Sequence, residues 1–562
     1  MKQLVAAVVC VLLIGCNAVD NPQMRSRQPY DSGGPVRPEQ AAFDVLHYDL
    51  SLRIEPERRF ITGELAMRAL ALEPLDRVLL DLDPVFEVSA AWQDPDMGRV
   101  PVTFSRMGPE LWIDLVDSAA VGDTVELVVA YSGQPREAPI PPWEGGFSWA
   151  ETADGEPWVG VSCQVDGADV WWPCKDHPSD EPDDGVGLHF TVPEELTVVS
   201  NGRLVGVTDE EDGWQTFHWR VSTPINLYDV TVNAAPFIPI ETTFTNVLGE
   251  SHTVTWWALP ESVERGRELL DELVLQLRFL EDEIGPYPFR ADKVAVVHTP
   301  YLAMEHQTAI SLGLDGDAQR AGFSYILLHE LTHEWWGNLV SASDWRDFWL
   351  HEGFDGYMEA RYAEFLGGEA AYHDYMDRYF RPGVLNQRPV APSDPKWIRE
   401  VFVTIEDDRG GFATWDADAY LKGALILHTL RYLVGDEVFA DVLRRWAYPD
   451  PATEGVTNGG QCRSVTTEQF QAHVETMSGR DLGWFFDVYL RQAELPILVT
   501  RQSGEGLTLR WEAPGGGPFP MPVELHMGDE LRRVEMTDGE GQIDIPAGVE
   551  PVVDPLNWIL RQ

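Results

Sequence analysis

The spacing of two histidines and one later glutamate places the tightest constraint on how this chain can fold. His329 and His333 occur in the sequence His-Glu-Leu-Thr-His, inside an apolar segment that predicts a helix over about 322–338. At about 100° per residue, the two histidines lie one turn apart on one helix face, where two imidazoles can bind a single Zn²⁺. Glu330 is turned to the side, where it can reach a water on the metal and act as a general base.

A second predicted helix, over about 352–366, begins with Glu352, and 18 residues separate Glu352 from His333. An antiparallel return of that length can bring the carboxylate to the same metal. Two histidines and one glutamate leave a fourth position for water, as a catalytic zinc site requires. We therefore predict one Zn²⁺ per chain, bound by His329, His333 and Glu352. Glu359, two turns later, is expected on a solvated helix face, with contact to a metal ligand as the alternative.

The hydrophobic pattern changes twice along the 562 residues, which predicts a multidomain α+β protein. Residues 43–240 contain short alternating or valine-rich runs broken by Gly, Pro and Asp, which are typical of an N-terminal β-sheet domain. Residues 241–494 carry Leu and Val at three- and four-residue spacing and indicate a mainly helical domain with some strand. Two further long helices are expected there, over about 260–284 and 421–446. The strand pattern returns over 495–562, which is long enough for a small C-terminal β-sandwich.

The first 42 residues predict export and lipid anchoring. After Lys2, an apolar run too short to span a bilayer indicates a signal peptide over residues 1–15. The run ends in Leu-Ile-Gly-Cys, which resembles a bacterial lipobox and predicts acylation of Cys16; an ordinary signal peptide cleaved nearby is the alternative. Residues 16–42 are expected to form a flexible tether. The predicted location is the bacterial cell envelope, at the outer membrane or facing the periplasm, with membrane contact through the lipid anchor only.

Composition limits the partners and the cross-links of the chain. Lys plus Arg total 41 against 92 Asp plus Glu, and a net charge of -51 repels phosphate backbones, so nucleic acid is excluded as a partner. We interpret this charge as a solvated, salt-adapted surface and the 21 Trp residues as members of packed cores. A disulfide between Cys163 and Cys174 is one hypothesis, and inert buried thiols are the other.

The segment from His329 to Glu359 resembles the aminopeptidase N family of gluzincin zinc metallopeptidases. The resemblance includes Trp-Trp-Gly-Asn-Leu-Val at residues 335–340, between the two predicted metal helices. Peptidases of the thermolysin type share the His-Glu-x-x-His motif but differ in this intervening sequence. The resemblance extends over about 43–562. It implies a thermolysin-like catalytic domain over 241–494 and peptide substrates with a free N-terminus.

Three residues outside the metal motif take roles that this resemblance implies. Glu305, in the sequence Ala-Met-Glu, would receive the ammonium group of the substrate; only a free N-terminus supplies that opposite charge. Gln164 would reach the same ammonium from the N-terminal domain. Tyr420, in the sequence Tyr-Leu-Lys-Gly, would donate its phenolic hydrogen to the developing oxyanion. The resemblance assigns a structural role to a further set of potential metal ligands: Cys174, Asp176 and His177.

The sequence departs from the family pattern at four positions. Leu302 stands at a usual Gly and His306 at a usual Asn, which bears on the shape of the first substrate pocket. His351 replaces a usual Asn and Asp355 a usual Ala, and neither change removes a metal ligand. We also expect a short form without the large C-terminal helical domain of many relatives, with a more open site that admits longer peptides.

Together these features predict a zinc-dependent aminopeptidase with Glu330 as general base. One alternative is a zinc endopeptidase with the same metal site, which an N-acetylated substrate would distinguish. A second is an epoxide hydrolase activity, which one branch of the family has. A non-catalytic peptide-binding lipoprotein of the envelope would be marked by loss of a metal ligand or of Glu330. A structural or adhesive envelope protein is the last alternative, and no repeat or low-complexity span supports it.

Overall fold

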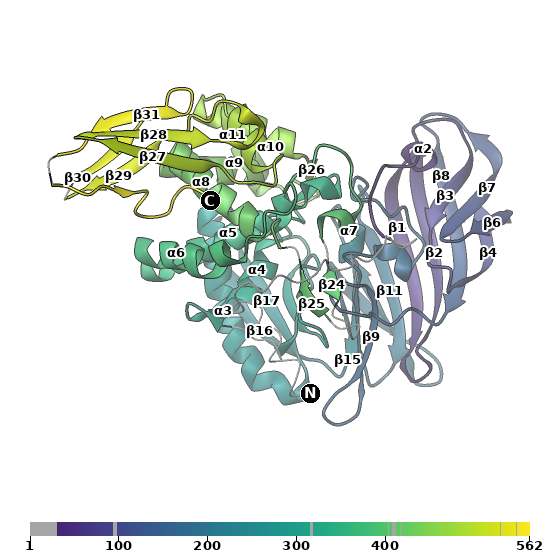
Figure 1. The fold of residues 1–562 in the computed structure, drawn as a ribbon. Helices are drawn as coiled ribbons and strands as arrows, with labels where there is room; N and C mark the ends of the chain where they lie inside the picture. Colours follow the sequence, from purple (N-terminus) through teal and green to yellow (C-terminus); the bar gives the residue numbers. More distant parts are fainter. Residues whose placement is uncertain are drawn as a thin grey trace.

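Three regions follow one another along the molecule (Figure 1). The computed structural model describes residues 31–93, 98–314, 319–402, 404–406, 412–415, 417–528, 530–546 and 548–562. The predicted signal peptide and Cys16 lie outside the described residues. β-sheets occupy one end of the molecule, helices the centre and a second group of strands the other end, which confirms the predicted α+β class. Within the described ranges, no helix is both long and apolar enough to cross a bilayer.

The first region is built on an eight-stranded sheet. Its order is β13 (Arg203–Asp209), β14 (Trp214–Arg220), β11 (Val186–Pro193), β1 (Phe43–Glu55), β2 (Phe60–Ala71), β8 (Thr124–Gly133), β4 (Glu87–Gln93) and β5 (Val100–Pro101). The alternation predicted in β1 is present, because Tyr48, Leu50 and Leu52 are buried while Ser51 is exposed. β1 pairs with β11 in parallel and with β2 in antiparallel orientation.

Two smaller sheets complete this region. One has the order β12 (Thr197–Ser200), β15 (Val232–Ala235), β10 (Pro157–Ser162) and β9 (Gly146–Glu151). The other has the order β3 (Leu75–Asp81), β7 (Glu110–Ala119) and β6 (Phe104–Met107). Gln164 lies two residues after the end of β10, so the sheet that contains β10 carries this residue toward the second region.

The second region combines a five-stranded sheet with helices. The sheet order is β16 (Ile238–Thr245), β17 (Ser251–Ala258), β18 (Val294–His298), β20 (Ile310–Leu312) and β19 (Ala303–Met304). The helices are α3 (Val263–Glu283), α4 (Tyr325–Thr332), α5 (Trp349–Gly367), α6 (Glu369–Tyr375), α7 (Ile398–Val401), α8 (Leu421–Val434), α9 (Asp436–Ala447), α10 (Thr467–Ser478) and α11 (Gly483–Tyr489). Short strand pairs are β21 (Gln319–Arg320) with β22 (Phe323–Ser324), β23 (Val340–Ala342) with β26 (Arg463–Val465), and β24 (Thr404–Glu406) with β25 (Phe412–Trp415). β16 crosses the boundary predicted at residue 240.

Two of the predicted helices have different limits in the structure. The helix expected over 322–338 ends at Thr332, and the chain then turns at Gly337, whose φ of 140° no ordinary side chain favours. The helix expected over 421–446 is two helices, because Gly435 adopts a φ of 89° between α8 and α9. In the second case a glycine with positive φ interrupts a continuous apolar pattern, whereas α4 ends five residues before Gly337.

The third region is a small sandwich of two three-stranded sheets. One has the order β27 (Ile497–Ser503), β28 (Gly506–Glu512) and β31 (Glu540–Asp544), and the other β30 (Glu530–Val534), β29 (Val523–Met527) and β32 (Val552–Val553). Leu509 and Trp511 of the first sheet and Leu525 of the second are buried. The region contacts α8, where Tyr432 donates a hydrogen bond to the carbonyl of Pro522 (3.2 Å).

The tether expected over 16–42 is wrong for the part that the structure describes. Asp31 and Ser32 are buried, and residues 38–41 form the short helix α2 (Pro38–Ala41). Gly33 and Gly34 have positive φ and lie against the rings of Trp345 and Trp397, where a Cβ atom would collide with the indoles. These glycines therefore allow close packing, although the sequence pattern indicated flexibility.

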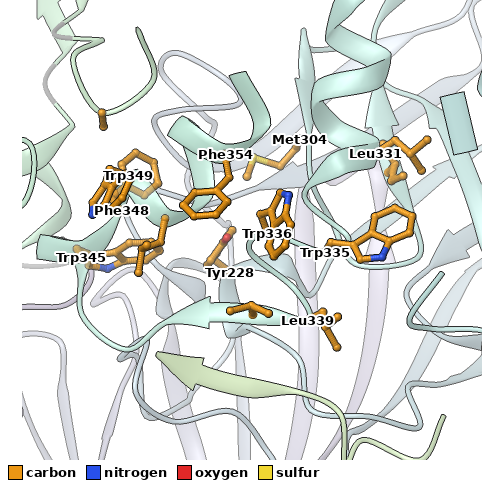
Figure 2. Close-up of a cluster of buried hydrophobic side chains, with 14 of the residues drawn as sticks. Tyr228, Met304, Leu331, Trp335, Trp336, Leu339, Trp345, Phe348, Trp349 and Phe354 are labelled. Atoms are coloured by element: carbon orange, nitrogen blue, oxygen red, sulfur yellow. The ribbon is translucent and has the colours of Figure 1, made fainter. Parts of the chain in front are cut away.

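Aromatic side chains fill the core behind the central helices (Figure 2). Trp335, Trp336, Trp345 and Trp349 are each at most 1% exposed, and the ring centroids of Trp336 and Phe354 lie 5.2 Å apart. Close contact between tilted aromatic rings of this kind adds to the free energy gained by burying the rings. The tryptophans on either side of the metal helices therefore act as packing residues and hold α4 and α5 in a fixed relation.

Candidate metal centre and active site

The metal-binding side chains converge where α4 meets the start of α5. His329 belongs to α4, and His333 is its C-terminal cap residue with helical backbone angles, so both imidazoles stay on one face. Glu352 lies in the first turn of α5. The Nε2 atoms of His329 and His333 lie 3.1 and 3.5 Å from Oε2 of Glu352. The structure thus brings together the three residues that spacing alone predicted as ligands.

These separations fit a zinc ion. Zn²⁺ in tetrahedral coordination, with bonds of about 2.0–2.2 Å, keeps its ligand atoms roughly 3.3–3.6 Å apart. The three ligand atoms here all lie within 4.8 Å of one another. Burial opposes the charge on Glu352, but the neighbouring imidazoles of His333 and His329 lower the pKa of this carboxyl to about 2. A charged carboxylate beside two imidazole nitrogens is a donor set that zinc prefers.

Glu359 contacts a metal ligand, so its expected place on a solvated helix face is wrong. Its side chain is nearly buried, and Oε1 lies 3.1 Å from Nδ1 of His329. Tyr375 donates a hydrogen bond to Oε2 of Glu359 (2.6 Å), and Arg320 lies 3.6 Å from the same oxygen. The prediction of a solvated Glu359 failed because α5 is buried on nearly all sides, whereas a glutamate two turns into a helix usually faces water.

Two departures from the family pattern lie directly beside the metal centre. Oδ2 of Asp355 lies 2.6 Å from Nδ1 of His333, and Asp355 is fully buried. His351 accepts a hydrogen bond at Nε2 from the backbone N–H of Ala342 (2.8 Å), which attaches the start of α5 to β23. Neither residue displaces a ligand. Sequence reasoning did not find the contact of Asp355, although its position three residues after Glu352 puts both side chains on one face of α5.

Glu330 lies beside the ligands, as its place between the histidines predicted. Its side chain is mostly buried, and one carboxylate oxygen lies within 4.8 Å of ligand atoms of both Glu305 and His333. Burial raises the pKa of Glu330 to about 8, against the opposing effect of His329. A carboxylate with a high proton affinity next to a metal site can accept a proton from water and pass it on.

A second carboxylate closes one end of the site. Gln164 donates a hydrogen bond from Nε2 to Oε1 of Glu305 (2.7 Å), and Tyr228 donates to the same oxygen (3.2 Å). All three side chains are at most 4% exposed. Gln164 and Tyr228 come from the N-terminal region, so two domains meet at this carboxylate. Tyr228 was not predicted, because nothing in its local sequence indicates a contact with a residue 77 positions away.

Tyr420 reaches the metal centre because α5 and α8 approach unusually closely. A Cβ atom on Gly353 would lie only 2.9 Å from Cα of Gly423, so the two glycines allow backbone contact between these helices. The ring of Tyr420 then stacks on His329, with centroids 5.9 Å apart. Burial and the nearby charge of Glu352 hold the pKa of Tyr420 well above its usual value. The phenol therefore keeps its proton at neutral pH and can donate it to an oxyanion.

The remaining candidate residues lie outside the metal centre. His306 is fully buried and contacts the hydroxyl of Ser311 through Nδ1 (2.9 Å). His177 contacts the carbonyl of Gly34 through Nε2 (2.8 Å), in line with the structural role expected for its segment. Cys163 and Cys174 are buried free thiols, so the disulfide hypothesis is wrong and the alternative of buried thiols holds.

Comparison with known protein families gives two matches. The Peptidase M1 N-terminal domain matches residues 45–228, and the Peptidase family M1 domain matches residues 270–489. Aminopeptidase B of Mus musculus is 26% identical over 451 residues, which cover 74% of this chain and 65% of that protein. Endoplasmic reticulum aminopeptidase 1 of Homo sapiens is 27% identical over 70% of this chain and 43% of its own length. The matched part of the chain thus spans about two fifths to two thirds of the length of these two relatives.

Solved structures give a similar result. The M1 zinc metallopeptidase of Deinococcus radiodurans, in a mutant form bound to a Tyr-Ser-Ala substrate, superimposes with a TM-score of 0.64 at 26% identity. The match covers 81% of this chain and 96% of that one. A two-domain M1 zinc metallopeptidase bound to L-tryptophan gives the same score and coverage.

Proposed function

Because the chain belongs to peptidase family M1, we propose that it is a zinc-dependent aminopeptidase that removes residues one at a time from the N-terminus of peptides. The metal ligands His329, His333 and Glu352, the base Glu330 and the phenol Tyr420 would serve this reaction together. The family match and the fit of the ligand atoms to zinc support the metal. Peptides with a free N-terminus are the proposed substrates.

The buried carboxylate of Glu305 is the observation that carries the proposal. Glu305 lies beside Glu330 and His333, and Gln164 and Tyr228 both donate hydrogen bonds to it. A substrate ammonium group would find a negative charge here in a water-poor environment, where ion pairs are strong. A peptide held by its N-terminus at this point presents its first peptide bond to the metal centre, which explains release of single residues rather than internal cleavage.

The residues of the chain divide the catalytic work among them. Zn²⁺, when bound, supplies a Lewis acid that acidifies a water molecule and polarises the peptide carbonyl. Glu330 accepts the proton of the attacking water and returns it to the leaving amine. Tyr420 donates its phenolic hydrogen to the carbonyl oxygen as negative charge develops there. Glu305 and Gln164 hold the ammonium and thereby fix which carbonyl reacts.

Kinetics on matched substrates test the proposal. Fluorogenic aminoacyl amides are offered with a free or an acetylated N-terminus to the wild type and to Glu305→Gln, which has the same shape without the charge. We expect cleavage of the free amines only. The substitution should lower kcat/KM about 10²–10³-fold, because loss of a buried charge partner costs about 3–4 kcal/mol. Glu283→Gln, a half-exposed carboxylate paired with Arg361, is the matched control and should be unaffected.

Cleavage of the acetylated substrates at a comparable rate would contradict the role of Glu305. That result would favour the zinc endopeptidase that shares the same metal site. Zinc bound without any hydrolysis would favour a peptide-binding protein instead.

We propose that the chain is anchored in the bacterial cell envelope through lipid on Cys16. The apolar run before Cys16 and the lipobox-like Leu-Ile-Gly-Cys sequence support this proposal. A lipid anchor would hold the peptidase at the outer membrane or facing the periplasm. Replacement Cys16→Ala should move the protein from the membrane fraction to the soluble fraction. Equal membrane association of the wild type and the variant would contradict the anchor.

A further inference from the structure

Both metal-binding histidines present their Nδ1 atoms to a carboxylate of α5. Glu359 lies 3.1 Å from Nδ1 of His329, and Asp355 lies 2.6 Å from Nδ1 of His333. From this geometry we infer that Asp355 is a positioning residue of the metal centre, which orients His333 and strengthens the binding of the metal. The inference rests on the zinc site of the proposed function. It concerns a residue that the family pattern, with a usual alanine here, does not supply.

The helix period explains how α5 can carry these contacts together. Glu352, Asp355 and Glu359 are three and four residues apart, so all three carboxylates lie on one face of the helix. Glu352 faces the Nε2 atoms of both histidines, whereas the other two carboxylates reach round to the Nδ1 atoms. One rigid helix therefore supplies a metal ligand and a contact behind each of the other two ligands.

The hydrogen bonds around His333 fix where its proton lies. The backbone carbonyl of Trp336 is 3.0 Å from Nδ1 of His333, and a carbonyl oxygen can only accept a hydrogen bond. Nδ1 therefore carries a proton that it donates to the Trp336 carbonyl, and Oδ2 of Asp355 lies 2.6 Å from the same nitrogen as a charge contact without a hydrogen bond. In the neutral imidazole, Nε2 then has the free lone pair with which it would bind the metal. A carboxylate on the far side of the imidazole increases the basicity of that lone pair.

The burial of Asp355 and His333 indicates that their contact does more than fill space. Asp355 is 0% exposed and His333 is 1% exposed. A carboxylate at such a position costs free energy unless it is paired, and an alanine would avoid that cost. The ring of His333 is the partner that the structure gives to Asp355, so removal of the carboxylate should be felt at the metal.

Zinc affinity of the full-length protein tests the inference without reliance on catalysis. The metal is removed with a chelator, and zinc is titrated back in competition with a chromophoric chelator of known affinity. Asp355→Asn keeps the shape and removes the charge, and we expect it to bind zinc about 10–100-fold more weakly than the wild type. Asp347→Asn is the matched control, because Asp347 is equally buried but bonds to Thr467 (2.6 Å). The control should bind zinc within twofold of the wild type.

An affinity of Asp355→Asn within twofold of the wild type would overturn the inference. If the asparagine variant does not fold, Asp355→Ala answers the same question, because the smaller side chain introduces neither strain nor an unpaired polar group. The result is independent of the proposed function in one further way. A wild type that binds zinc tightly but cleaves no peptide would defeat the proposed activity, while weaker zinc binding by the variant would still support the role of Asp355.

Discussion

Replacement of Arg399 should destabilise the protein more than replacement of any exposed arginine. The Arg399 guanidinium bonds to three carboxylates, those of Asp31 (2.5 Å), Glu144 (3.2 Å) and Asp166 (2.6 Å). The arginine side chain is 8% exposed, and the three carboxylates are at most 1% exposed. This group joins the N-terminal segment, the first domain and α7 of the second domain.

The expected loss in the free energy of unfolding follows from the burial of Arg399 and its partners. Removal of one partner from a buried ion pair typically costs about 3–5 kcal/mol, because the remaining charge stays out of water. Arg136 also pairs with Asp166 at 2.8 Å, so Asp166 keeps one cation when Arg399 is replaced. For Arg399→Met, which keeps an apolar stem of similar length, we expect a loss of about 3–5 kcal/mol. Because Asp166 lies two residues after Gln164, binding of the substrate ammonium should weaken as well.

Urea unfolding followed by tryptophan fluorescence measures this loss. The control is Arg378→Met, because Arg378 forms an exposed pair with Asp374 whose side chains are 62% and 55% exposed. Such a pair contributes about 0.5 kcal/mol or less, so the control should unfold like the wild type. A cost below about 1 kcal/mol for Arg399→Met would refute the reasoning, since the buried carboxylates would then not depend on this cation.

Three further predictions concern the catalytic residues and the response to acid. Glu330→Gln should lower kcat by about 10²–10⁴-fold with the zinc content unchanged, as measured by steady-state kinetics and metal analysis. Tyr420→Phe should lower kcat by about 10²–10³-fold with little change in KM; a normal kcat would remove Tyr420 from the mechanism. Burial lowers the pKa of His306 from 6.5 to about 3, so the folded state binds fewer protons than the unfolded state between these values. The contribution of His306 to stability is complete well above pH 6.5 and falls as the pH decreases, by about 3 kcal/mol at pH 4.5. Unfolding of His306→Asn should show a shallower loss over this range, and parallel curves would contradict the assignment.

The parts of the site set by one helix could be predicted from the sequence. The spacing of His329 and His333 fixes their relation within α4, and the later Glu352 needed only a returning helix. Glu305 and Gln164 lie 141 residues apart, and only the family resemblance linked them. Their meeting depends on how two domains pack, which no local pattern encodes.

The errors in the prediction have tertiary causes. Glu359 was expected to face solvent because a helix inside a protein core cannot be recognised from its polar residues. The glycines at 33 and 34 indicated flexibility, yet each fits against an indole ring where a side chain would collide. The single helix expected over 421–446 failed because the positive φ of Gly435 separates α8 from α9. For Glu359 and the two glycines, the residues that decide the outcome lie far away in the sequence. For Gly435, the cause is a backbone angle that composition does not reveal.

The most direct test of the central claim is a time course of peptide digestion followed by mass spectrometry. One peptide of mixed sequence is offered with a free N-terminus and as its N-acetylated copy, with and without a zinc chelator, to the wild type and to Glu330→Gln. A zinc aminopeptidase should produce a ladder of products shortened by one residue at a time, from the free peptide only. The ladder should disappear with the chelator and in the variant. Internal fragments, or equal digestion of the acetylated copy, would contradict the account.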